Sequence, residues 1–349
     1  MPDKNIFKKY FMHHRNVFFQ IGIFIFSCIF VCLAIGISIR FGASNLTYQQ
    51  IWDGVFHYDG ENFEHVILHE LRFPRAIAAL LVGAALGVAG AIMQGITRNA
   101  LASPSIMGIT AGASFFVAIA YAIQDQPSFY QLIAASFVGA GLSTALVFGL
   151  TAVSRGGISP VKLALAGAAM TALLNSLSTA IGLKFDIAKD ISYWYAGGLH
   201  TIQPMHIQIA FPFVIIGIIL AIILSRSISV LNLGEDVAKG LGQRTNRIRV
   251  LCTIAVLLLT GAAVSIAGMI GFVGLVVPHI VRALVGVDYR WIIPMSAIFG
   301  GTLLLFADIV ARVVNRPFET PVGAITALIG VPFFLYFARK DGRSLSCKD

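Results

Sequence analysis

Nine long stretches without a charged residue constrain the fold of this chain more than any other feature of its sequence. They cover residues 16–39, 76–97, 99–124, 126–154, 163–183, 191–225, 250–281, 291–307 and 320–338. A helix needs about 20 apolar residues to cross the hydrocarbon core of a bilayer, and most of the stretches are that long. We therefore predict an all-α polytopic membrane protein.

The composition also indicates that the solvent of this chain is lipid. Of the 349 residues, 57% are hydrophobic and 12% are charged, about half the charge content of ordinary soluble domains. The net charge of +9 could indicate a nucleic-acid partner. Positive charge in a membrane protein usually lies in cytoplasmic loops, however, and we expect no nucleic acid to bind.

The number of crossings follows from the longest stretches. Residues 250–281 exceed one span and contain Gly268, Gly271, Gly274 and Pro278, so we predict two crossings there and about ten in all. With the N-terminus inside, the cytoplasmic segments hold 18 of the 25 Lys and Arg residues, as the positive-inside rule requires. Both termini are therefore predicted to be cytoplasmic.

Small residues recur at helical spacing inside the spans. Gly83, Gly87 and Gly90 lie in the second span, and Gly108 and Gly112 lie in the third. Small residues four apart let helix backbones approach closely in lipid. This pattern predicts close helix packing and carries no chemistry.

The spans offer few groups that could bind a driving ion or perform catalysis. The ionisable exceptions are His279, near the inner side, and Asp308 and Glu319, at span ends. A phosphate loop, a zinc-protease motif and a serine elbow are all missing from the sequence, and the four cysteines form no disulfide or metal pattern. We expect no enzyme, no metal and no cofactor in this chain. A channel, or the pore of a machine powered by another subunit, fits better than an ion-coupled secondary transporter, which remains the alternative.

The long cytoplasmic segment between the sixth and seventh spans has the features of a short helix. Asn232 is the expected cap with Glu235 three residues later, and Gly242 is expected to stop the helix in a left-handed conformation. Leu233, Val237 and Leu241 form one apolar stripe. The stripe could lie on lipid headgroups or in a protein cleft, and the mixed charges of the polar face favour the cleft.

Five motifs together resemble the FecCD-type permease family, the membrane subunits of ATP-driven ABC importers for iron–siderophores, haem and cobalamin with the type II import fold. The motifs occupy residues 71–75, 99–104 with Gly108 and Gly112 beyond them, 233–242, 271–279, and 307–312 with 319–323 beyond them. The resemblance covers nearly the whole chain and implies a single permease domain over residues 1–349. Ala100 departs from the family, which usually has proline there.

The resemblance implies an assembly with several partners. A second permease subunit, identical or paralogous, completes the pathway, two cytoplasmic ATPase subunits bind ATP and Mg, and an external binding protein delivers the ligand. The segment at about 231–243 is implied to couple to the ATPase. Its contact residues would be Leu233, Gly234, Glu235, Ala238, Leu241 and Gly242.

The resemblance further implies that Arg72, Arg75 and Arg312 dock the binding protein. The predicted topology places all three on the external face, at headgroup level, where we expect them to be available to a partner. An alternative is that Arg312 only pairs with Asp308, one turn earlier. Docking by bidentate bonds to carboxylates would suit arginine.

The substrate is the least constrained feature. Trp194, Tyr195, Gly197 and Gly198 resemble a W-x-x-G segment of the family, although aromatic residues are common at membrane interfaces, and the substrate residues stay unknown. Iron–siderophore is the expected cargo because most family members carry it, with haem or cobalamin as alternatives. The resemblance places the protein in the bacterial cytoplasmic membrane.

Overall fold

The computed structural model describes residues 4–41, 46–153, 160–200, 202–315 and 318–346, which form helices and connecting turns without a strand. Among the described residues, seven helical stretches are long and apolar enough to cross a membrane. One is the continuous stretch Phe63–Thr97, which ends with α4 (Phe73–Thr97), and the others lie within α1 (Lys4–Arg40), α6 (Phe129–Val153), α7 (Pro160–Lys184), α9 (Pro204–Asn232), α11 (Thr245–Ala267) and α13 (Tyr289–Val313). The all-α prediction is therefore confirmed.

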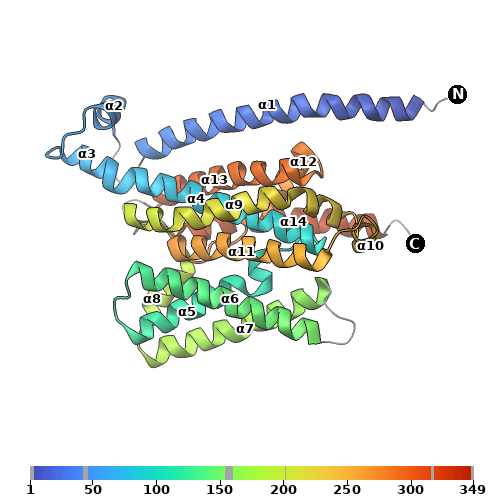
Figure 1. Ribbon diagram of the computed structural model, residues 1–349. Helices are drawn as coiled ribbons and strands as arrows, with labels where there is room; N and C mark the ends of the chain where they lie inside the picture. Colours follow the sequence, from blue (N-terminus) through green and yellow to red (C-terminus); the bar gives the residue numbers. More distant parts are fainter. Residues whose placement is uncertain (1–3, 42–45, 154–159, 201, 316–317, 347–349) are drawn as a thin grey trace.

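Three further apolar helices are shorter. They are α5 (Ile109–Ile123), α12 (Val273–Val285) and the first part of α14 (Val322–Ser346). Figure 1 shows the start of α1, the end of α14 and the short helix α10 (Glu235–Gly240) at one end of the bundle. This is the arrangement that an even number of crossings requires, while the count of ten and the cytoplasmic termini stay predictions.

Short helices connect the spans. At the end opposite α10 (Figure 1) lie α2 (Tyr48–Phe56), α3 (Phe63–Ile67), the π-helical turn η1 (Leu68–Arg72) and α8 (Ala188–Ala196). The 3₁₀ turn η2 (Pro104–Met107) precedes α5. The two ends of the bundle thus carry different short elements.

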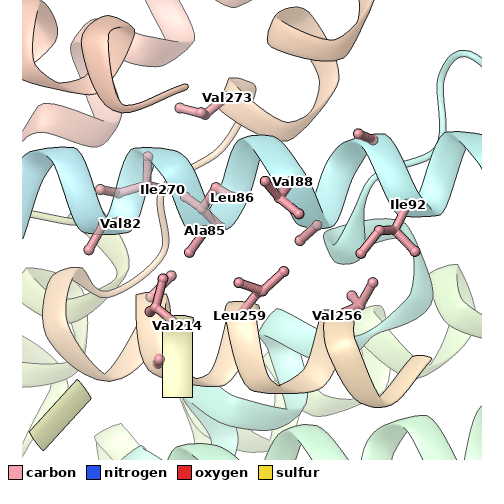
Figure 2. Close-up of a cluster of buried hydrophobic side chains, with 14 of the residues drawn as sticks. Val82, Ala85, Leu86, Val88, Ile92, Val214, Val256, Leu259, Ile270 and Val273 are labelled. Atoms are coloured by element: carbon pink, nitrogen blue, oxygen red, sulfur yellow. The ribbon is translucent and has the colours of Figure 1, made fainter. Parts of the chain in front are cut away.

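Helix α4 is the centre of the bundle and is buried along nearly its whole length. Figure 2 shows Val82, Leu86 and Ile92 of α4 opposite Val256 and Leu259 of α11. These side chains belong to one continuous apolar core. Because this core surrounds α4 on every side, α4 needs no polar face and shows no amphipathic pattern.

Glycines bring α4 into direct backbone contact with its neighbours. A methyl group added at Gly83 would collide with the carbonyl oxygen of Gly300 on α13, and one at Gly90 with that of Gly274 on α12. Gly112 of α5 is similarly close to Gly139 of α6. The predicted packing by small residues is confirmed.

The break predicted inside residues 250–281 is also confirmed. Helix α11 ends at Ala267, and α12 begins at Val273. Gly268 has a φ of 67° and Phe272 a φ of 66°, left-handed values that an α-helix cannot contain. A side chain at Gly268 would also collide with the carbonyl oxygen of Trp194, so this break lies directly against the end of α8.

Candidate coupling and docking sites at the two ends of the bundle

The short helix α10 is present, but it does not begin as predicted. Asn232 is the last residue of α9, and Gly234, with a φ of 138°, makes the turn before Glu235 opens α10. The prediction that Asn232 caps this helix is wrong, because α9 continues through Asn232. Gly242 does adopt the predicted left-handed conformation, with a φ of 77°, just after the helix ends at Gly240.

Helix α10 presents its apolar stripe away from the protein. Leu233, Val237 and Leu241 are 69%, 47% and 68% exposed, whereas Ala238 is fully buried against the bundle. Three apolar side chains on one exposed face form a candidate interaction surface, since large exposed apolar patches mark interaction sites. Nothing in the described part of this chain covers them.

An ion pair fixes α10 to the span that follows it. Arg249 of α11 donates a 2.7 Å hydrogen bond from Nη2 to Glu235 Oε2, and Lys239 Nζ lies 3.0 Å from Glu235 Oε1. Hydrogen bonds from Lys239 and Arg249 hold the pKa of the Glu235 carboxyl below its ordinary value. Glu235 therefore stays charged at neutral pH, and the α10 stripe is held in one orientation relative to α11.

At the opposite end, the structure brings two of the three predicted arginines, Arg75 and Arg312, together around one carboxylate. Asp308 is fully buried. Arg75 Nε donates to Asp308 Oδ1 at 2.9 Å, and Arg312 Nη2 lies 2.9 Å from Asp308 Oδ2. Arg75 Nη1 also donates to Glu319 Oε1 at 2.7 Å. The predicted Arg312–Asp308 pair is confirmed as part of a network linking α4, α13 and the connection to α14.

Two of the arginines bind the end of α1. Arg72 Nη1 donates to the carbonyl oxygens of Ile39 and Arg40, at 2.6 and 3.0 Å. Arg312 Nη1 donates to the carbonyl oxygens of Ser38 and Phe41, at 3.0 and 2.8 Å. The last carbonyls of a helix have no partner inside the helix. Arg72 and Arg312 donate to four consecutive carbonyls at this end of α1, those of residues 38–41.

This arrangement corrects one expectation. Arg72 and Arg312 are only 6% and 7% exposed, and the side chain of Arg75 is 12% exposed. The prediction that all three are freely available at headgroup level is wrong, because the end of α1 and Asp308 already engage their guanidinium groups. The exposed edge of the cluster is Glu319, at 44%. A docking role for these residues stays a prediction.

Two cavities of about 230 and 210 Å³ lie beside this end of the bundle and share Gly198 and His200 in their walls. In the first, His206 stacks on Phe129 with ring centroids 4.1 Å apart, and the buried indole nitrogen of Trp194 has no hydrogen-bond partner. Each cavity is below the ~300 Å³ of sites that enclose a drug-sized ligand. Neither is large enough to surround a bulky chelate.

Part of the W-x-x-G segment lies at the first cavity. Its Trp194 and Gly198 line the first cavity, while Tyr195 packs beside a separate apolar cluster. His200 and His206 gave no signal in the sequence, since each is a single histidine in a polar connection or at a span end. In the described ranges, His, Cys, Asp and Glu side chains form no group of three that could hold a metal.

Comparison with known proteins identifies the family. The FecCD transport family matches residues 29–340. The chain belongs to the FecCD transport family. Its relatives include the iron(3+)-hydroxamate import system permease protein FhuB of Bacillus subtilis, 54% identical over 90% of this chain and 82% of the relative. The iron-uptake system permease protein FeuB of the same organism is 46% identical over 89% of this chain and 93% of the relative.

A more distant relative and a solved structure also match. The hemin transport system permease protein HmuU of Yersinia pestis is 34% identical over 88% of this chain and 91% of the relative. A metal-chelate-type ABC transporter, solved in an inward-facing conformation, superposes with a TM-score of 0.81 at 29% identity, covering 91% of this chain and 99% of that chain. This FecCD chain is a permease subunit of an ABC importer and a multi-pass protein of the bacterial cytoplasmic membrane.

Proposed function

We propose that this permease forms half of the translocation pathway of an ATP-driven importer for iron–siderophore complexes. The other half is a second copy or a paralogue. Two cytoplasmic ATPase subunits bind ATP and Mg and perform the hydrolysis, and an external binding protein delivers the chelate. The observation that carries this proposal is the exposed, fixed apolar stripe of α10.

Helix α10 is the proposed coupling element. It is too short to span a membrane, and its polar face mixes acidic and basic residues, unlike the basic face of helices that lie on anionic lipid. Leu233 and Leu241 would enter an ATPase cleft, with Gly234 and Gly242 giving the turns at either end. The Glu235–Arg249 pair would transmit motion of α10 directly to α11, because it joins the two helices at 2.7 Å.

The substrate class rests on the relatives. The one named for iron(3+)-hydroxamate is 54% identical, the iron-uptake permease 46% and the hemin permease 34%. A hydroxamate siderophore is therefore the first ligand to test. Haem and cobalamin are the alternatives within the family.

The binding protein is proposed to dock over Arg75 and Glu319. Arg75 is the arginine of the cluster that does not cap α1, and its partner Glu319 is half exposed. An acidic side chain of the binding protein could take the place of Glu319 on Arg75. Arg72 and Arg312 would support this surface indirectly, by holding α1 against α4 and α13.

An ion-coupled mechanism gains no support. Asp308 is the one buried carboxylate in the described part of the chain, and it lies near the end of α13 between two arginines. A carboxylate held by two fixed cations is poorly suited to releasing and rebinding a driving ion.

The coupling proposal is tested by Leu241→Asp, which places a charge in the α10 stripe. Val287→Asp is the matched control, since Val287 is 67% exposed and the neighbouring Asp288 contacts Ser229 near the end of α9. Ligand-stimulated ATP hydrolysis and uptake are measured with the assembled transporter at equal amounts of permease. We expect both to fall with Leu241→Asp alone. Unchanged coupling in Leu241→Asp would remove α10 from the ATPase contact.

A further inference from the structure

Helix α2, in the external connection between α1 and α4, carries an exposed aromatic stripe. Tyr48, Trp52 and Phe56 are spaced four residues apart and are 71%, 61% and 61% exposed. This spacing places all three on one face of the helix. The rings of Trp52 and Phe56 lie 4.3 Å apart, so the stripe is a continuous apolar surface.

The opposite face of α2 is fixed to the protein. Ile51 packs on the cluster of Ile39, Leu46 and Leu68. Gly54 is buried so closely that an added methyl group would lie 2.7 Å from Leu68. Thr47 caps the helix in a complete capping box. The direction of the aromatic stripe is therefore set by packing on the inner side of α2.

The stripe begins where the exposed apolar surface of α1 ends. The α1 side chains Phe26, Phe30, Leu33 and Ile37 are between 41% and 68% exposed on a membrane-spanning helix. Arg40, the last residue of α1, donates a 2.6 Å hydrogen bond to the Tyr48 hydroxyl and lies 4.4 Å from the centre of its ring. Figure 1 shows α2 beside this end of α1.

We propose that Tyr48, Trp52 and Phe56 lie in the headgroup region of the external leaflet and anchor this end of the permease to the bilayer. Tyrosine and tryptophan concentrate at that depth because each has an apolar ring and a polar group. The nine residues of α2 are too few to cross the hydrocarbon. Arginine at a span end extends its charge to the headgroup level, which is where Arg40 meets Tyr48.

Lipid fits this stripe better than a soluble protein does. Asp53 is the one acidic residue of α2, and its carboxylate lies 3.9 Å from the imidazole of His57. The face itself is aromatic and uncharged. It also continues the exposed apolar surface of α1, a helix long and apolar enough to cross a membrane. The anchor depends on the membrane location of the chain and not on its cargo or its ATPase.

Tryptophan fluorescence tests this proposal, because the chain has three tryptophans. The Trp194→Phe, Trp291→Phe double variant leaves Trp52 as the single probe, reconstituted in vesicles of phosphatidylcholine with phosphatidylglycerol. Lipids brominated near the headgroup are compared with lipids brominated near the chain end. We expect Trp52 to lose more emission to the shallow bromines than to the deep ones.

If the double variant does not fold, a second measurement on chains that keep Trp194 and Trp291 tests the same point. Quenching of the parent chain is compared with that of Trp52→Phe, and the difference isolates Trp52 without altering Trp194. Shallow quenching that disappears in Trp52→Phe supports the anchor. Equal quenching of the two chains would overturn it, because Trp52 would then lie in water. A third outcome would also overturn the anchor. If Trp52 is shielded from water only after the binding protein is added, the stripe contacts that protein and not lipid.

Discussion

Replacing Arg312 by methionine should destabilise the protein itself, whatever it does to docking. The change keeps most of the apolar stem and removes the guanidinium. That group donates to the carbonyl oxygens of Ser38 and Phe41 at 3.0 and 2.8 Å and to the Ser38 hydroxyl at 2.7 Å. It also pairs with Asp308 at 2.9 Å. Arg312→Met therefore breaks contacts with both α1 and α13.

The magnitude follows from what each partner loses. A buried polar group left without a partner costs about 1–3 kcal/mol, and two carbonyl oxygens at the end of α1 lose their Arg312 donor. Breaking a buried ion pair can cost about 3–5 kcal/mol. Asp308 retains Arg75, however, at 2.9 Å, so that full cost does not apply. We expect a total loss of about 3 kcal/mol from these terms.

The assay is the thermal unfolding midpoint of the purified permease, with Arg290→Met as the control. The Arg290 side chain is 56% exposed and pairs with Asp288 at 2.7 Å, and such surface pairs contribute about 0–1 kcal/mol. Arg312→Met should melt several degrees below the parent, and Arg290→Met should melt close to it. Equal midpoints for the two variants would refute the structural role of Arg312.

Three further predictions concern other parts of the chain. Gly90→Val should lower the yield and the melting temperature, since overpacking costs about 1–3 kcal/mol or more, whereas Gly141→Val, at a glycine with open space around it, should be tolerated. Arg75→Gln should weaken binding-protein affinity, and more so at low salt than at moderate salt because screening weakens charge contacts; equal affinity would exclude Arg75 from docking. The strength of the α10–α11 ion pair should not change with pH between about 8 and 5, because the pKa of Glu235 in the folded protein is lowered. The pair should weaken only as the pH falls below the ordinary Glu pKa of about 4.3. Loss of hydrogen-exchange protection in α10 near pH 6 would contradict this.

The sequence predicted those features that depend on local composition. Charge-free stretches located most of the spans, because about 20 predominantly apolar residues are what a helix needs to cross the hydrocarbon. Gly268 marked the break before α12, and Gly83 and Gly90 marked the close approach of α4 to its neighbours. In each case the residue type carries the structural requirement by itself.

The sequence did not predict contacts between distant segments. The burial of Arg72 and Arg312 depends on the end of α1. That segment is more than 30 residues from Arg72 and more than 270 from Arg312 along the chain, and the motifs around the two arginines give no sign of this contact. The Asn232 cap failed for a related reason, since packing extends α9 beyond a residue that would otherwise suit a helix start. His206 stacks on Phe129, which lies in a distant segment of the sequence, only through the fold.

The central claim is that ATP hydrolysis by a partner subunit, acting on this permease, drives uptake. It is tested by uptake of an iron(III)-hydroxamate siderophore into vesicles holding the assembled transporter, with ATP on the cytoplasmic side and an ionophore that collapses ion gradients. Uptake should require ATP and should persist after the gradients collapse. Uptake that continued without ATP, or that stopped with the gradient while ATP was intact, would contradict the claim and indicate an ion-coupled transporter.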